Sequence, residues 1–184
     1  MFKRRKQRTL VESAREWVWP RAGWNRLLLY YRHRLVRLPD SSYRIAAGLA
    51  CGAAISFTPF IGMHVLLAMV LAYAMRANVV AAVIGTIVGN PWTIPLILVL
   101  TYRMGAWAMG LDTHVGITDL FDVEVFFLNP WQALKPVLPP MIIGGVPLGV
   151  LIWWLVYWPA YQVIERYKLQ RLKYLQRQGE SGEN

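Results

Sequence analysis

The sequence predicts an all-α integral membrane protein, and three observations carry this prediction. Hydrophobic residues make up 56% of the 184 residues and charged residues 16%, with a mean hydropathy of +0.34, whereas a typical soluble domain is roughly 25% charged. Three runs without a formal charge, of 31, 26 and 29 residues, each exceed the roughly 20 residues that cross a hydrocarbon core. The charges gather at the two ends and in one loop. This pattern excludes a disordered chain, a coiled coil and an ordinary soluble enzyme.

The charge distribution divides the chain into a basic cytoplasmic segment (1–39), a membrane domain (40–164) and a basic cytoplasmic tail (165–184). Residues 1–44 hold twelve Lys or Arg against three acids, whereas the loop 103–135 holds two basic and four acidic residues. Basic residues beside membrane segments favour the cytoplasm. We therefore expect a multi-pass protein with both termini inside and the acidic loop outside.

An amphipathic surface helix is expected to precede the membrane domain and to lie on the inner leaflet. Its apolar residues recur near helical spacing among four arginines: Trp24, Leu27, Leu28, Tyr31, Leu35 and Leu38, with Arg26, Arg32, Arg34 and Arg37. Anionic phospholipid would hold this surface, at about 1 kcal/mol per basic residue, and nucleic acid is the less favoured partner. Pro39 ends the helix, and Asp40 or Ser41 is placed to cap the next one.

The first apolar run, 45–75, is interrupted near its middle by Thr58 and Pro59. Proline removes a backbone donor and clashes with the preceding turn. The two arms are about 20 and 22 Å long at 1.5 Å per residue, too short to cross a core of about 30 Å alone. The run is therefore either one kinked, strongly tilted helix or a re-entrant hairpin.

The second run, 77–102, repeats this design with Asn90-Pro91 in its middle and Pro95 one turn later. At an offset of 32 residues, Arg44 and Pro59 align with Arg76 and Pro91, and an internal repeat is an open alternative to chance similarity between apolar segments. Paired interrupted segments are a pointer to a transporter site. With both ends inside, 45–102 must cross an odd number of times, which favours a re-entrant hairpin followed by one broken transmembrane helix.

The third run, 136–164, supplies the C-terminal transmembrane helix that returns the chain to the cytoplasm. Trp153, Trp154 and Trp158 would lie towards the inner interface as an aromatic belt. The loop 103–135 is expected to form an outer amphipathic helix, because its acidic residues alternate with phenylalanines.

Each run carries one Gly-x-x-x-Gly motif, a spacing that allows close approach of helix backbones in lipid. The motifs are Gly48/Gly52, Gly85/Gly89 and Gly145/Gly149. We favour packing within the chain over a dedicated dimer face.

Broken helices at membrane depth leave polar backbone groups that need a partner, a buried position or a watery cavity. Thr58-Pro59 and the segment from Asn90 to Thr93 are therefore candidate ligand sites. Asn90 and Thr93 would contact the ligand or merely satisfy the freed backbone.

Three further residues complete the candidate site. Arg76 and Asn78 lie between the interrupted runs, and arginine makes planar contacts to phosphate, so Arg76 would hold a lipid headgroup or simply mark the interface. His64 is an ionisable group within an apolar arm; it would be either proton-linked or a packing residue.

Signatures of enzymes are missing: the chain has no Gly-x-Ser-x-Gly, Cys-x-x-Cys, His-Glu-x-x-His or P-loop motif. Three His and one Cys leave little material for a metal site or a disulfide framework. We expect no catalysis, no cofactor and no metal.

Three short motifs carry a resemblance to a known family: Thr58-Pro59-Phe60-Ile61-Gly62, Arg76-Ala77-Asn78 and the string from Gly85 to Pro95. Over roughly residues 35–165, the chain resembles the bacterial family catalogued as domain of unknown function 2062. The resemblance implies an integral protein of the bacterial inner membrane and no particular chemistry.

Two functional hypotheses follow. The leading one is a membrane protein that binds or transports an anionic amphiphile or small anion at the interrupted helices, as a homo-oligomer because the protomer is small. Its rival is a non-catalytic accessory protein that stabilises a partner membrane complex through its glycine faces and basic helix.

Overall fold

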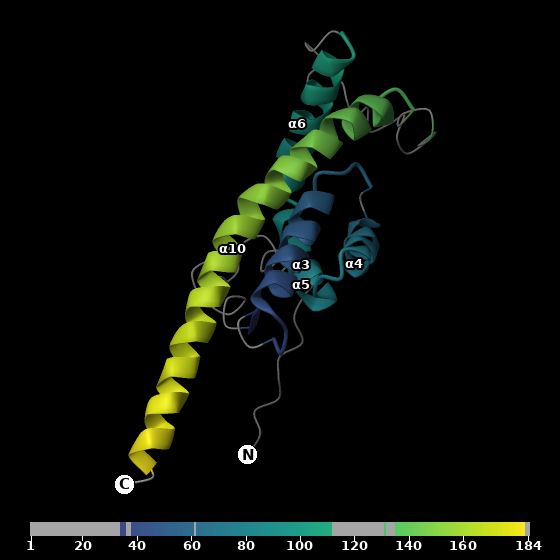
Figure 1. Cartoon of the computed structure of the whole chain (residues 1–184). Coiled ribbons are helices and arrows are strands. Elements are labelled where there is room, and N and C mark those ends of the chain that lie inside the picture. Colours follow the sequence, from purple (N-terminus) through teal and green to yellow (C-terminus); the bar gives the residue numbers. More distant parts are fainter. Residues whose placement is uncertain (1–33, 36–37, 61, 112–130, 132–134, 183–184) are drawn as a thin grey trace, which may run out of the picture.

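The computed structural model describes residues 34–35, 38–60, 62–111, 131 and 135–182, with side chains to residue 178. Most of these residues are helical and none lies in a strand, which confirms the all-α prediction. The helices are α3 (Ser42–Ile55), α4 (His64–Ala74), α5 (Val79–Gly85), the 3-10 turn η1 (Thr86–Val88), α6 (Thr93–Ala108) and α10 (Leu138–Gly182) (Figure 1). Most of the predicted surface helix and of the acidic loop lies outside the described residues.

Helix α3 begins and ends on hydroxyl side chains. Ser41 is its N-cap and accepts a hydrogen bond from the Arg44 amide at 3.2 Å, so one of the two predicted caps is confirmed. At the other end Ser56 Oγ donates back to the Gly52 carbonyl at 3.0 Å. Most of α3 is buried, because its alanines, glycines and Cys51 let three other helices approach it.

The first apolar run forms a helical hairpin and not one kinked helix. After the turn at Thr58 and Pro59, α4 returns along α3 and ends beside its first turn. The Asn78 amide donates to the Arg44 carbonyl at 2.8 Å, and Cys51 Sγ lies 3.4 Å from Met75 Sδ. The hairpin arrangement of the two helical arms, one of the two predicted alternatives, is thus confirmed.

Helix α5 and η1 then run beside α3 in the same direction. A Cβ on Gly48 would overlap the Asn78 carbonyl, and one on Gly52 would overlap the Ala82 carbonyl. Gly85 in turn lies against the Leu49 carbonyl. At these positions only glycine permits the backbone distance. The first two glycine motifs therefore pack against each other within one chain.

The two interrupted turns lie at the same end of this helix pair. A Cβ on Gly89 would lie 3.0 Å from the Ser56 side chain, so the turn after η1 meets the turn after α3. From there α6 departs at 86° to the α5–η1 axis. The predicted break of the second run is confirmed.

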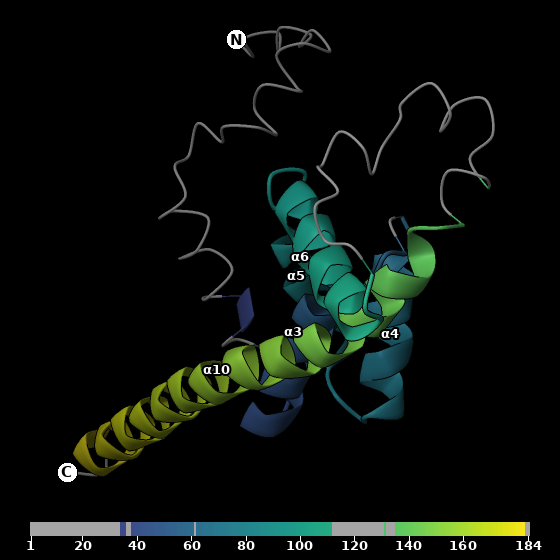
Figure 2. The same cartoon turned by 90° about the horizontal axis from the view of Figure 1, so that it is seen from above.

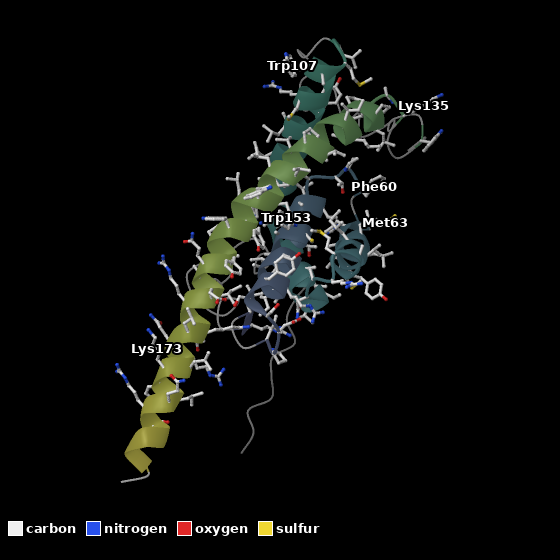
Figure 3. All side chains as sticks on the ribbon, viewed as in Figure 1. Phe60, Met63, Trp107, Lys135, Trp153 and Lys173 are labelled. Carbon is white, nitrogen blue, oxygen red and sulfur yellow. The ribbon has the colours of Figure 1, made fainter. Side chains whose placement is uncertain are left out.

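Helix α10 spans the whole molecule and is about 68 Å long at 1.5 Å per residue. It runs antiparallel to α6, where Gly144 and Gly105 give close contacts, and then past α3, where Gly145 meets the Phe57 carbonyl. Further along, Tyr157 lies edge-on to Tyr43 with ring centroids 6.1 Å apart. Trp107 and Lys135 mark one end of the molecule and Lys173 the other (Figure 3).

Helix α10 continues through the segment 165–184, which the charge pattern predicts as a separate cytoplasmic tail. The helix extends to Gly182 without a break at residue 164, because Leu, Lys, Arg and Gln predominate there and are good helix formers. Its C-terminal half extends beyond the other described helices (Figures 1 and 2).

By length and hydropathy, the segment Leu138–Gln178 could cross a membrane, and the bent pair of Val79–Val88 and Thr93–Ala108 could form a second crossing if it acts as one span. Only 22% of the most apolar stretch of α10 is buried against the described chain. Its exposed apolar side chains include Ile142, Ile143, Val146, Val150, Leu151, Trp154, Leu155 and Trp158.

Candidate anion-binding site

A polar cluster forms where α3 begins and α4 passes into α5. Arg44 organises it: its Nη1 donates to Asp40 Oδ1 at 2.9 Å, and its Nε donates to the Arg76 carbonyl at 2.9 Å. Asn78 Nδ2 donates to the second Asp40 oxygen at 3.0 Å. Lys168 Nζ, from α10, donates to the Asp40 carbonyl. Four elements are thereby joined at one end of the molecule.

The Asp40 carboxyl is held as a carboxylate. Desolvation would raise its pKa, but hydrogen bonds from Asn78 and the Ser41 amide, together with the charge of Arg44, lower the pKa below its ordinary value. Asp40 therefore holds the Arg44 guanidinium in place through Nη1, and Nη2 of Arg44 takes no part in this ion pair.

Arg76 occupies an unusual backbone position, with a φ of 52°. It follows the C-cap of α4 in a Schellman turn, in which the Ala77 amide reaches the Ala72 carbonyl at 2.7 Å and the Arg76 amide reaches the Tyr73 carbonyl at 3.0 Å. Glycine is the usual residue here, because a side chain in this conformation costs free energy. Within the described part of the chain, the Arg76 guanidinium has no hydrogen-bond partner.

A cavity of about 800 Å³ opens beside these residues. Its polar lining comes from the two arginines, from Asp40 and Asn78, and from the phenol groups of Tyr43 and Tyr73. The lining contains two arginines and one aspartate and is therefore net positive, and the cavity volume lies within the range of ligand pockets. Such a cavity is suited to a phosphate or another oxyanion.

The structure thus brings together two of the five predicted contact residues, with different roles. Arg76 faces the cavity. Asn78 is fully engaged, since its Oδ1 accepts from the Ala81 amide at 2.8 Å as the N-cap of α5 while its Nδ2 holds Asp40. Arg44, Tyr43 and Tyr73 were not among the predicted residues. The alignment of Arg44 with Arg76 in the offset comparison was the one signal that could have found Arg44.

Asn90 and Thr93 lie elsewhere, at the far end of α5–η1, about 15 Å away at 1.5 Å per residue. Asn90 Oδ1 accepts from the amides of Trp92 at 2.9 Å and Thr93 at 3.0 Å. Thr93 Oγ1 accepts from the Asn90 amide at 3.0 Å and donates to the Val88 carbonyl. These are the bonds expected if both side chains satisfy the freed backbone.

The other helix-break residues are also engaged locally. Thr58 Oγ1 donates to the Ile55 carbonyl at 2.7 Å. Pro59 and Pro91 lie in the turns between helices, and Pro95 lies in the first turn of α6, where a missing N–H costs little. The two turns are thus closed without a ligand.

His64 is the first residue of α4 and is partly buried. It is separated from Arg76 by the length of α4, about 18 Å. Within the described residues it has no hydrogen-bond partner. A shared site with Arg76 is therefore not formed.

The remaining predicted packing residues, Gly145 and Gly149, lie against the carbonyl of Phe57, just after α3, and that of Ala54 on α3. All six predicted glycines therefore contact other elements of the same chain. In the described ranges, no group of three His, Cys, Asp or Glu side chains is close enough to hold a metal ion.

The described residues define a small helical protein with a helical hairpin, a bent helix pair, a long apolar helix and a basic cavity. The chain belongs to the family described as an uncharacterized protein conserved in bacteria (DUF2062), whose model matches residues 25–173. This confirms the resemblance seen in the sequence. Neither the curated proteins nor the solved structures contain a match to the chain.

Proposed function

We propose that the protein is integral to the bacterial inner membrane. The core helix of a soluble protein is mostly buried, whereas the most apolar stretch of α10 is only 22% buried and exposes valine, isoleucine and tryptophan side chains along its length. Lipid is the medium in which such a surface is stable. In this proposal α10 and the bent pair of α5–η1 and α6 cross the bilayer, while α3 and α4 form a re-entrant hairpin.

The basic end of the molecule is cytoplasmic in this proposal. Arg44 and Arg76 lie at the same end as the C-terminal half of α10, which carries five basic residues and one acid between 165 and 178. The positive-inside tendency supports this orientation. The interrupted turns at the other end of α3 then lie within the bilayer, where the side chains of Thr58, Asn90 and Thr93 form local hydrogen bonds with the backbone.

The function proposed for this protein is binding, without catalysis, of an anionic amphiphile by its headgroup at the Arg44–Arg76 cavity. One observation carries the proposal: an arginine with no hydrogen-bond partner among the described residues occupies a turn position that glycine fills at lower cost, and it lines the same cavity as Arg44, which Asp40 holds in place. Two guanidinium groups at the membrane interface match the chemistry of a phosphate headgroup. The same residues would serve a carrier that moves such a lipid.

A thermal-shift titration in neutral detergent tests the proposal, with palmitoyl lysophosphatidic acid as ligand and lysophosphatidylcholine as the zwitterionic comparison. The acidic lipid should stabilise the wild-type protein. Arg76→Gly should weaken binding about tenfold to a hundredfold, because a charge-assisted hydrogen bond contributes about 1.5–3 kcal/mol. Arg103→Ala, which removes an exposed arginine on α6, should bind as the wild type does.

Inorganic phosphate as a competitor separates the two sources of the anion. If phosphate alone stabilises the protein as strongly as the lipid does, the ligand is a free anion and the amphiphile proposal is wrong. Equal stabilisation of the wild-type protein and Arg76→Gly by the lipid would contradict binding at the Arg44–Arg76 cavity and favour the accessory role.

A further inference from the structure

We infer that the hydrocarbon chain of this amphiphile runs from the Arg44–Arg76 cavity along α3 into an apolar groove at the α3–α4 turn. This inference rests on the proposed function and adds to it the class of ligand: a phosphate-bearing lipid with a long chain that one groove accommodates. The occupant is one chain of the same molecule whose headgroup the arginines hold.

The groove has a volume of about 490 Å³ and three walls. Its floor is α3 at Ala54 and Ile55, one side is α4 at Leu71 and Met75, and the other side is α10 from Gly145 to Trp154. Thr58 is the polar residue at its end, and its hydroxyl is already bonded to a carbonyl. Gly145 and Gly149 add no side chains to the wall, so the lining offers an almost wholly apolar surface.

A continuous set of residues joins the basic cavity to this groove. Tyr43 lines the cavity and packs edge-on against Tyr157, which stacks on Trp153 with ring centroids 4.8 Å apart. Trp153 lines the groove and lies on the side of α10 that packs against the α3–α4 core (Figure 3). On α4 the change occurs between neighbours, since Ala74 lines the cavity and Met75 the groove.

The path has the dimensions and polarity of an amphiphile. From Arg44 to Thr58, at the far end of the groove, the rise of a helix is about 21 Å, so a long chain would fill the groove to its end while a short chain would occupy only its beginning. A second apolar groove, of about 550 Å³ between α5–η1 and α10, has no charged residue in its lining. Neither groove has a charged residue in its lining, and the groove at the α3–α4 turn is chosen because Met75, which lines it, is adjacent to Ala74, which lines the basic cavity.

Filling the groove tests the inference independently of the headgroup site. Val150 lines the groove and is 59% exposed, whereas the adjacent Leu151 is 53% exposed and lines neither groove. Val150→Phe therefore occupies the groove without disturbing packing, and Leu151→Phe is its matched control. Affinities for palmitoyl and hexanoyl lysophosphatidic acid are measured on the full chain by native mass spectrometry.

The wild-type protein and Leu151→Phe should prefer the palmitoyl ligand by at least about tenfold, since each buried methylene favours binding. Val150→Phe should lose most of this preference and keep its affinity for the hexanoyl ligand. An unchanged preference in Val150→Phe, with both ligands lost in Arg76→Gly, would overturn the groove and leave the headgroup site intact. Retention of both ligands by Arg76→Gly would instead overturn the proposed function itself.

Discussion

Replacing Arg76 by glycine should make the folded protein more stable, although it removes a charged side chain. Arg76 adopts a φ of 52° in the Schellman turn after α4, and a left-handed residue with a Cβ costs about 1–2 kcal/mol. Glycine removes this cost, but its greater conformational freedom in the unfolded chain lowers the stability of the folded protein by about 0.4–1 kcal/mol. The net gain is about 1 kcal/mol, because the guanidinium has no described partner to lose.

Thermal unfolding in neutral detergent without added lipid measures this effect. A gain of about 1 kcal/mol raises the midpoint by about 2–4 °C in a chain of this size. Arg76→Ala is the control, since alanine keeps the Cβ and therefore the strain, and it should lack this rise. A melting midpoint of Arg76→Gly that is equal to or lower than that of Arg76→Ala would show that the turn carries no such strain. The argument that Arg76 occupies this position at a cost in stability would then be refuted.

Three other predictions concern packing, charge and the interrupted turns. Gly85→Leu should abolish recovery of folded protein, because even a Cβ overlaps the Leu49 carbonyl, whereas Val80→Leu on the exposed side of the same helix should express normally; equal yields would contradict the packing. Asp40 has a lowered pKa, so its stabilising effect is present above the unfolded pKa of about 4 and is lost as the pH falls through the folded value. The melting difference between wild type and Asp40→Asn should therefore be largest near neutral pH and shrink in acid; a difference independent of pH would rule this out. Thr93→Val should lower the free energy of unfolding by about 1–2 kcal/mol, because the hydrogen bonds of the Thr93 hydroxyl with the backbone are lost. Lipid retention should be unchanged in this variant. A loss of lipid would show that the turn at Thr93 is part of the binding site.

Much of the fold could be predicted because its causes are local. In the first two uncharged runs a central proline predicts an interruption, and the turns at Pro59 and Pro91 lie where the sequence places them, whereas Pro147 and Pro159 in the third run lie inside α10 without ending it. Ser41 begins α3 because a hydroxyl accepts from the exposed amides of a first turn. The glycine spacing predicts close approach, and each motif meets a backbone carbonyl of another element.

The site was predicted less well because its residues meet only through tertiary contacts. Arg44 and Arg76 are brought together by the return of α4 along α3, and nothing in the local sequence selects Arg44 as a neighbour of the Arg76 carbonyl. Asn78 and Thr93 look alike in sequence as polar residues in apolar surroundings. Hydrogen bonding shows that Asn78 supports Asp40 and that Thr93 closes a turn.

The length of α10 could not be predicted from the charge pattern either. The change from apolar to basic residues after 164 predicts a change from lipid to water around the chain, and it does not mark the end of the helix. Helix propensity does not change there, so the helix continues while its surroundings change from the other helices to an exposed surface.

The most direct test of headgroup binding is native mass spectrometry of the protein extracted with its own lipid, wild type beside Arg76→Gly. Anionic lipid held between two arginines should appear as one phosphate-bearing species on the wild-type protein and be missing from the variant, which folds at least as well. The same lipids in the same amounts on both proteins would contradict binding at the Arg44–Arg76 cavity.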